Sequence, residues 1–177
     1  GIGANYQLSD QFNIAAAFLA SDGFYYDEDG DEEIFADGNT LFAQLTYQPN
    51  DRFVAALTFN RAYSPDYLGL EATVVPNLFL ARQKPTVQRA IALNMGYEFS
   101  EAFTLSGWLG YEWANTQGYD ANFNRFSWAL NFCSPDLFAE GNYGGVSIGA
   151  FPYVTRESWR FLESEDTPIL AQAFFRI

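Results

Sequence analysis

Carboxylates are the only reactive side chains present in number, because the chain has no histidine and one cysteine, Cys133. Without histidine, Ser-His-Asp and Cys-His triads and the usual zinc ligand sets are excluded. Glu98 and Glu112 remain as a candidate acid-base pair, since both belong to the polar side of consecutive predicted strands. Counted from the turn near Ser100, they lie roughly 30 Å apart, whereas glycoside hydrolysis needs about 5 to 10 Å. We therefore predict that the chain is not an enzyme.

A second group of carboxylates lies in the acidic segment 21–38. An EF-hand reading that starts at Asp27 fails, because Glu32 and Gly38 stand where glycine and glutamate are required. Two interpretations remain, a solvated loop or an external loop that concentrates cations without binding them. The acidic loop residues are Asp27, Glu28, Asp29, Asp31, Glu32 and Glu33. We expect no metal site and no cofactor, and Cys133 fits a small hydrophobic residue.

Alternation of apolar and polar residues dominates the remaining sequence and predicts β-strands. In the segment 103–113, for example, phenylalanine, leucine, tyrosine and tryptophan share one side, while threonine, serine and glutamate share the other. Most predicted strands run 9 to 13 residues, close to the roughly 9 to 11 of a tilted membrane strand. They lie near residues 2–8, 12–20, 40–48, 52–62, 87–98, 103–115, 123–133, 143–153 and 167–177.

Composition narrows the class further. The chain of 177 residues carries 9 Lys plus Arg against 22 Asp plus Glu, a net charge of −13, which disfavours nucleic acid as a partner. Aromatic residues reach 19%, and the short apolar stretch 15–20 cannot form a membrane-spanning helix of roughly 20 residues. These features favour an all-β protein whose aromatic side chains contact an apolar environment.

Three short polar turns repeat one pattern, in which aromatic residues of the apolar side flank the turn six residues apart. Repetition of this unit predicts an aromatic girdle at one membrane-water interface. Its members are Tyr6, Phe12, Tyr47, Phe53, Tyr97 and Phe103. The alternate connections, such as 21–38 and 64–86, are much longer. Short turns at one end and long loops at the other are typical of an outer-membrane β-barrel.

In such a barrel, the polar side of the strands would line a water-filled channel. Arg125 and Arg176 are candidates for a transverse electric field in this acidic chain, and Trp108 places a large ring on the polar side. That ring could stack on a sugar or pack against an inward-folded loop. The predicted pore-lining residues are Gln44, Thr46, Asn94, Trp108, Glu112, Arg125, Asn131, Gln172 and Arg176.

An ordered series of motifs runs through nearly the whole chain. They are Tyr6-Gln-Leu-Ser-Asp-Gln-Phe12, Leu45-Thr46-Tyr47 before Asp51-Arg52-Phe53, Gly107-Trp108-Leu109-Gly110-Tyr111, Phe126-Ser-Trp-Ala-Leu-Asn131 with Pro135-Asp136-Leu137 and Glu140-Gly141-Asn142, and Asp166-Thr167 before Gln172-Ala-Phe-Phe-Arg176. The series resembles the cyanobacterial OprB-type porins, also called iron uptake or carbohydrate porins. The resemblance implies an outer-membrane barrel, usually a homotrimer, whose amino-terminal S-layer-homology region and final strands are absent from this sequence.

We therefore expect residues 1–177 to form part of one antiparallel up-and-down transmembrane β-barrel, with about nine of its 16 to 18 strands. The expected function is passive diffusion of small hydrophilic solutes, either inorganic ions including iron or small carbohydrates, across the cell outer membrane. No selective transition-metal site is visible, so iron would cross hydrated or chelated. The alternative is a soluble or secreted all-β carbohydrate-binding module, in which Leu45, Leu93, Leu109 and Leu130 pack against a second sheet.

Overall fold

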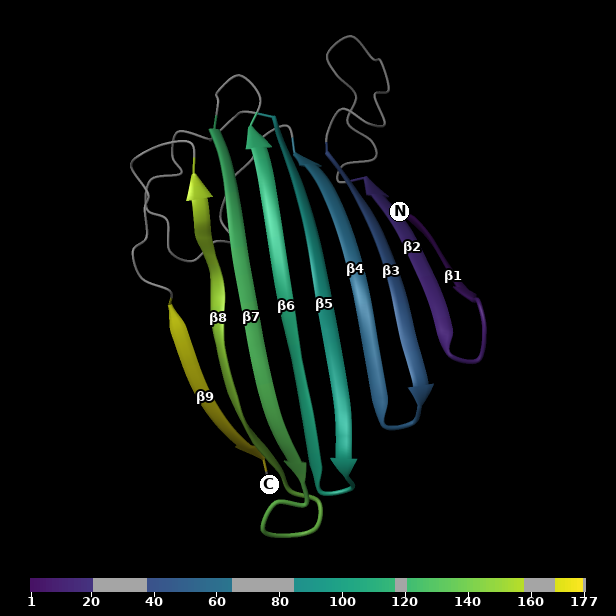
Figure 1. Cartoon of the computed structure of the whole chain (residues 1–177), viewed down its shortest axis with the longest axis vertical. Coiled ribbons are helices and arrows are strands. Elements are labelled where there is room, and N and C mark those ends of the chain that lie inside the picture. The colour runs from purple at the N-terminus through teal and green to yellow at the C-terminus, as the bar shows by residue number, and fades with distance from the viewer. Residues whose placement is uncertain (21–37, 65–84, 117–120, 158–167, 177) are drawn as a thin grey trace.

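The computed structural model describes residues 1–20, 38–64, 85–116, 121–157 and 168–176, which form a single antiparallel sheet of nine strands in chain order. The strands are β1 (Ile2–Gln7), β2 (Phe12–Ala20), β3 (Asn39–Asn50), β4 (Phe53–Ser64), β5 (Thr86–Ser100), β6 (Phe103–Thr116), β7 (Ala121–Pro135), β8 (Tyr143–Glu157) and β9 (Ile169–Arg176). Figure 1 shows the sheet as a curved wall with β1 and β9 at its edges. Within these ranges, no helix is long and apolar enough to cross a bilayer.

The sequence predicted nine antiparallel strands in up-and-down order, and this all-β class is confirmed. The largest difference in a strand boundary is at β8, which was predicted to end at residue 153 and continues to Glu157. The register between β7 and β8 shifts twice, once beside Arg125 and once beside Ser127. At each shift β8 has one residue more than β7, so the alternation of apolar and polar residues in β8 is interrupted. The pattern that predicted the strand therefore breaks before the strand ends. Closure into a transmembrane barrel stays a prediction.

Polar side chains close the short turns at one end of the sheet. In the β1–β2 turn, the Ser9 hydroxyl accepts hydrogen bonds from the backbone N–H groups of Gln11 and Phe12, at 3.3 and 3.2 Å. In the β3–β4 turn, Asn50 Oδ1 accepts from the N–H groups of Arg52 and Phe53, at 2.9 and 3.0 Å. Short polar side chains that bond the backbone two or three residues on are what a tight turn requires.

The β7–β8 connection is a wider loop at the same end of the sheet. Asp136 (φ 53°), Phe138 (φ 68°) and Gly141 (φ 87°) adopt left-handed conformations. The Asp136 carboxylate accepts a hydrogen bond from the Gly141 N–H at 2.7 Å, and the Asp136 N–H donates to the Asn142 carbonyl at 2.7 Å. These bonds offset the conformational cost of left-handed non-glycine residues.

The strand register gives the sheet one apolar face and one polar face. We define the apolar face by its central row, in which Leu45, Leu57, Leu93, Leu109 and Trp128 stand directly opposite one another across five strands. Side chains alternate between the faces along every regular strand. Each apolar stripe predicted from the sequence therefore continues into the stripes of its neighbours.

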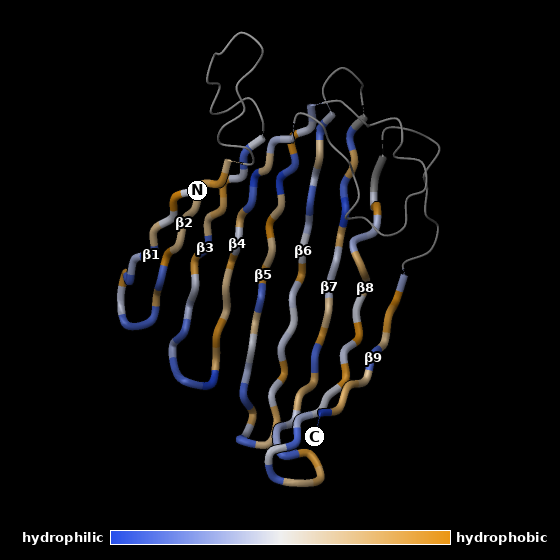
Figure 2. The backbone as a smooth tube through the Cα atoms, turned by 180° about the vertical axis from the view of Figure 1, so that it is seen from behind, coloured by the Kyte–Doolittle hydropathy of each residue, from blue (hydrophilic) through white to orange (hydrophobic). Residues whose placement is uncertain are grey.

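The polar face is defined by the neighbouring row, with Thr46, Ala56, Asn94, Trp108 and Ala129. Figure 2, which views the sheet from behind, shows hydrophilic and hydrophobic positions alternating along the strands. The two faces are therefore built from the same strands but from residues of opposite parity.

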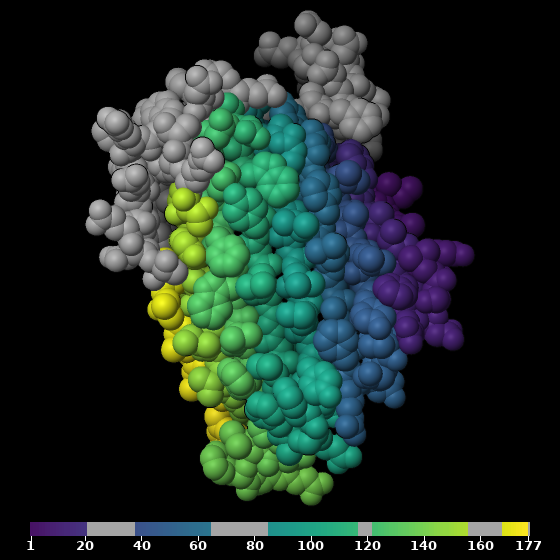
Figure 3. Space-filling model, viewed as in Figure 1, coloured from purple at the N-terminus to yellow at the C-terminus, as the bar shows by residue number. Residues whose placement is uncertain are grey.

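Large apolar side chains are exposed here, whereas the core of a soluble protein buries them. On the apolar face, Leu57, Leu109 and Leu130 expose 47, 48 and 43% of their surface. The buried apolar residues of the described ranges are three alanines, and no larger apolar side chain is buried there. Five buried residues lie on the polar face, namely Thr86, Ala114, Thr116, Arg125 and Ala129. Figure 3 shows the side chains of the described strands forming one continuous surface from β1 to β9.

Candidate functional site

The nine residues predicted to line a pore all have the parity of the polar face. The register places Glu112 opposite Arg125, Ser147 between Asn131 and Gln172, and Arg176 opposite Tyr143. The remaining members are Gln44, Thr46, Asn94 and Trp108. The structure therefore brings these side chains to one surface, while their role in a pore stays a prediction.

An ion pair joins β6 and β7 on this face. Arg125 Nη2 donates a hydrogen bond to Glu112 Oε1, and the two side chains are 7% and 23% exposed. The guanidinium also stands 5.3 Å from the centroid of the Phe123 ring. Among the described residues, its Nε–H finds no hydrogen-bond partner. A buried guanidinium held by one carboxylate is a fixed local charge pair, whose field is screened less by salt than that of surface charges.

The two arginines proposed for a transverse field are separated by the structure. Arg125 lies in the half of β7 near the long connections, whereas Arg176 is exposed at the opposite end of β9, facing Tyr143. The alternation in the sequence placed both arginines on the polar face. It gave no information about how far along the strands each of them lies. Glu112 and Arg125, from adjacent strands, are the charges that the structure actually brings together.

Uncharged polar side chains form cross-strand hydrogen bonds over the rest of this face. The Ser147 hydroxyl donates to Asn131 Oδ1 at 2.7 Å, joining β8 to β7. Farther along the sheet, the Thr58 hydroxyl donates to Gln44 Oε1 at 3.2 Å, and Gln44 Nε2 donates to the Thr46 hydroxyl at 3.0 Å. These bonds fix the side chains against the wall while leaving the face polar.

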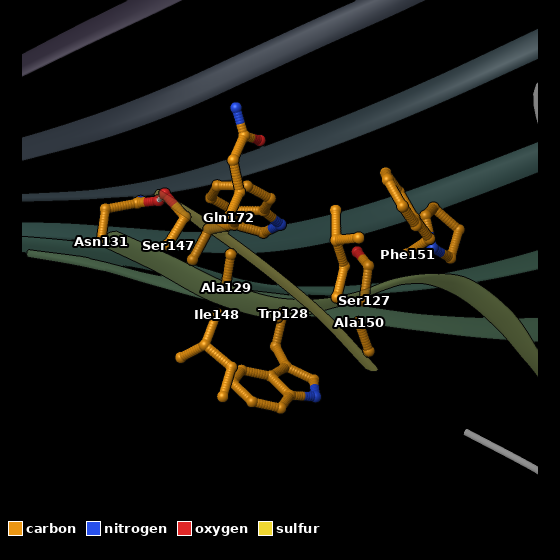
Figure 4. A pocket seen from close by; sticks show the side chains of 13 residues that line it. Ser127, Trp128, Ala129, Asn131, Ser147, Ile148, Ala150, Phe151 and Gln172 are labelled. Atoms are coloured by element: carbon orange, nitrogen blue, oxygen red, sulfur yellow. Dashed lines mark hydrogen bonds between the residues drawn. The ribbon is translucent and has the colours of Figure 1, made fainter. Parts of the chain in front are cut away.

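A hollow of about 330 Å³ opens over β6 to β9 on the polar face. Its floor is made of small residues, including Ala129 and Gly149, where an added Cβ would lie 2.4 Å from the Trp128 carbonyl oxygen. Trp108, which is 42% exposed, contributes to its lining. Figure 4 shows Asn131, Ser147, Gln172 and Phe151 on one side of the strands, with Trp128 and Ile148 directed to the other. The hollow thus combines ring surfaces with amide and hydroxyl groups.

Of the thirteen residues that line this hollow, the sequence reasoning listed Trp108, Asn131 and Gln172 as pore-lining. Phe151, Pro152 and Leu170 are among the ten that it did not list. The register shift opposite Ser127 places Phe151 and Pro152 out of the regular alternation. A proline inside a predicted strand is a signal for a bulge and could have indicated this position. Leu170 has the parity of the polar face, since it pairs with Gly149, but its type suggested the apolar face.

Trp108 stands between this hollow and a second one of about 290 Å³, which is lined by Val54, Asn94, Met95 and Ser106 among others. Asn131 contributes to both as well. The two interpretations of the Trp108 ring, sugar stacking and packing against a loop, both stay open as predictions. The position of the ring between two open hollows is compatible with both interpretations.

Aromatic rings form a continuous row at the turn end of the apolar face. Successive ring centroids lie 4.7 to 6.4 Å apart, within the range of stacked and edge-to-face pairs. The row comprises Phe12, Tyr47, Phe53, Tyr97, Phe99, Phe103 and Phe132. It contains five of the six residues predicted for a girdle. Tyr6 has the same parity but pairs with Ile14, two residues farther from the turn than Phe12.

The candidate acid-base pair is separated by the fold. Glu98 is opposite Thr104 and Glu112 is opposite Ala90, so the two levels are eight residue steps apart along β6, roughly 27 Å at 3.4 Å per residue. The acidic loop residues 27–33 lie outside the described residues. Cys133 is a partly exposed free thiol of the polar face, opposite Gly145.

Comparison with known proteins gives a distant relative without a functional description. An uncharacterised protein of Synechocystis sp., sll0772, is 25% identical over 199 residues, an alignment that covers all of this chain and 36% of that protein. The chain thus spans about a third of the length of the curated relative it matches. No protein-family model and no solved structure matches the chain.

Proposed function

We propose that residues 1–177 form part of the wall of a water-filled outer-membrane β-barrel, through which small hydrophilic solutes diffuse passively. The observation that carries the proposal is the exposed apolar face, on which large aliphatic side chains stand outward and no second layer of described residues covers them. Acyl chains of a bilayer would cover the exposed leucines. In water, the same surface would far exceed the apolar patches that soluble monomers expose.

The dimensions of the apolar face support this proposal. From Phe103 to Trp113, ten residue steps along β6, the face is apolar or aromatic at each position of this parity. At about 3.4 Å per residue and a tilt of about 40°, this stretch spans roughly 26 Å along the bilayer normal. The apolar band of outer-membrane barrels is about 25 Å tall. The aromatic row lies at its lower boundary, where amphipathic rings favour the interface.

The two edge strands require further strands. Backbone groups at the outer edges of β1 and β9 would have no hydrogen-bond partner in hydrocarbon, so a membrane sheet must close on itself. The rest of a longer protein, comparable to the relative that is almost three times as long, would supply the missing strands. We extend the proposal to a closed barrel of about 16 to 18 strands that resembles the OprB-type porins and assembles as a homotrimer.

The polar face favours weak, general interactions with solutes. Among the strand residues whose side chains the structure describes, the charged ones with polar-face parity are Glu98, Glu112, Arg125 and Arg176. A wall that carries charges of both signs would let inorganic ions, including hydrated iron, and small carbohydrates pass. We propose no catalytic activity for it.

Single-channel recording of the full-length protein in planar bilayers tests the proposal. We expect ohmic conductance in potassium chloride that decreases when chloride is replaced by a bulky anion, and that is reduced further by small sugars. The alternative, a soluble carbohydrate-binding module, predicts a protein that stays in the aqueous phase without detergent and forms no channels. That result would contradict the porin proposal.

A further inference from the structure

Two arginines face outward together at the end of the apolar face that is farther from the short turns. Arg61 on β4 stands directly opposite Arg89 on β5, in line with the apolar positions Leu57 and Leu93. Like charges directly opposite each other destabilise an antiparallel pair. Neither guanidinium forms an ion pair within the described residues, although the chain has 22 carboxylates. The pair therefore carries two positive charges that no carboxylate of the described residues offsets.

Asparagines hold both arginines without neutralising them. Arg61 Nη1 donates to Asn39 Oδ1 at 3.3 Å, and Arg89 Nη1 donates to Asn115 Oδ1 at 3.2 Å. Both asparagines lie one row beyond the arginines, away from the apolar belt. Each contact occupies one of the five N–H donors of a guanidinium. The charge and the remaining donors stay available at the boundary of the apolar face.

The apolar surface begins immediately below this pair. Phe59 and Ile91 form the next row toward the turns, followed by Leu57 and Leu93. Ile91 and Leu57 are exposed, so an uncovered apolar strip leads away from the two charges. A surface of this kind matches an amphiphile, whose anionic group would contact the arginines and whose acyl chains would follow the strip. A free anion would use the charges alone.

We propose that Arg61 and Arg89 bind the phosphate group of an anionic membrane lipid on the outer surface of the barrel. The proposal rests on the porin function above, because the apolar strip meets acyl chains only in a membrane. Guanidinium groups pair with phosphate oxygens through parallel N–H···O bonds, which are short and strong. One phosphate shared by two guanidinium groups would also convert their mutual repulsion into attraction.

Native mass spectrometry of the detergent-solubilised full-length protein tests this site. Phosphatidylglycerol, phosphatidylcholine with the same acyl chains, and inorganic phosphate would be titrated separately. We expect phosphatidylglycerol to bind at least tenfold more tightly than phosphatidylcholine, and R61Q/R89Q to lose this preference. R61K/R89K, which keeps both charges, should retain most of it. The control is R52Q, which removes a guanidinium from the turn end of the sheet and should bind as the wild type does.

Three results would overturn the site. They are unchanged phosphatidylglycerol affinity in R61Q/R89Q, an equal loss in R52Q, or complete competition by inorganic phosphate at the lipid's own concentration. Conductance of the same preparations separates this inference from the proposed function. A conducting R61Q/R89Q channel with unchanged lipid preference refutes the lipid site alone, whereas a wild-type protein without conductance refutes the porin function and the site together. If R61Q/R89Q does not fold, the single variant R61Q, compared with R52Q on the same strand pair, gives the same decision.

Discussion

Trp108 and Leu109 are neighbours in β6, yet they belong to surfaces with opposite requirements. Trp108 lies on the polar face between two hollows, and Leu109 lies at the centre of the apolar face in a row of leucines. Both are exposed to a similar degree, at 42 and 48%. The comparison shows that exposure alone does not distinguish the faces. The faces differ in the side chains that surround each residue, which are hydroxyl and amide groups around Trp108 and aliphatic groups around Leu109.

The largest effect should come from placing a charge on the apolar face. We expect Leu109→Arg to reduce the free energy of unfolding by about 2 to 4 kcal/mol in lipid, because the new cation would lie near the bilayer midplane. Trp108→Arg, one residue away on the polar face, should cost less than about 1 kcal/mol, the range found near water. Urea unfolding of the full-length protein in vesicles measures both. Equal losses would show that the two faces do not meet different solvents.

A smaller effect should follow from removal of one partner of the ion pair. Glu112→Gln leaves the Arg125 guanidinium enclosed without a carboxylate, and we expect a loss of about 1 to 3 kcal/mol, because Glu112 retains some contact with water. Glu98→Gln on the same face is the control and should be neutral. The double variant E112Q/R125M should recover most of the loss in the same urea titration. Failure to recover it would mean that the guanidinium is not the cause.

Sugar interaction with the Trp108 ring should be weaker still. If the ring stacks on a pyranose, Trp108→Ala should weaken the block of ion current by small sugars about fivefold, equivalent to about 1 kcal/mol of ring contact. Trp128→Ala removes a ring from the apolar face and should leave the sugar block unchanged. Current noise at increasing maltose concentration is the measurement. An unchanged block in Trp108→Ala would favour packing of the ring against a loop.

Neutralisation of the acidic loop should have the smallest effect. We expect the combined change of Asp27, Asp29, Asp31, Glu32 and Glu33 to amides to lower cation preference less than twofold near 0.15 M salt, with no change at 1 M, where the Debye length is about 3 Å. Reversal potentials in potassium chloride gradients report the preference. No change even at low salt would assign these residues to a solvated loop away from the channel mouth.

The fold was predictable from the sequence because strand alternation is a local signal, as the row of rings from Phe12 to Phe132 illustrates. The face of each pore-lining candidate followed from parity alone. The hollow was less accessible, since it depends on the register shift that brings Phe151 and Pro152 opposite Ser127. The arginine pair was also missed, because the opposition of Arg61 and Arg89 requires the exact pairing of β4 with β5, across a connection that gives no register.

Every described strand pairs only with its neighbours in the chain, and no interior must be repacked when a neighbour changes. Duplication or loss of one hairpin would therefore change the width of the sheet without disturbing the contacts of distant strands. In the barrel proposed above, channel width could thus evolve in steps of two strands while each hairpin keeps its own surface residues.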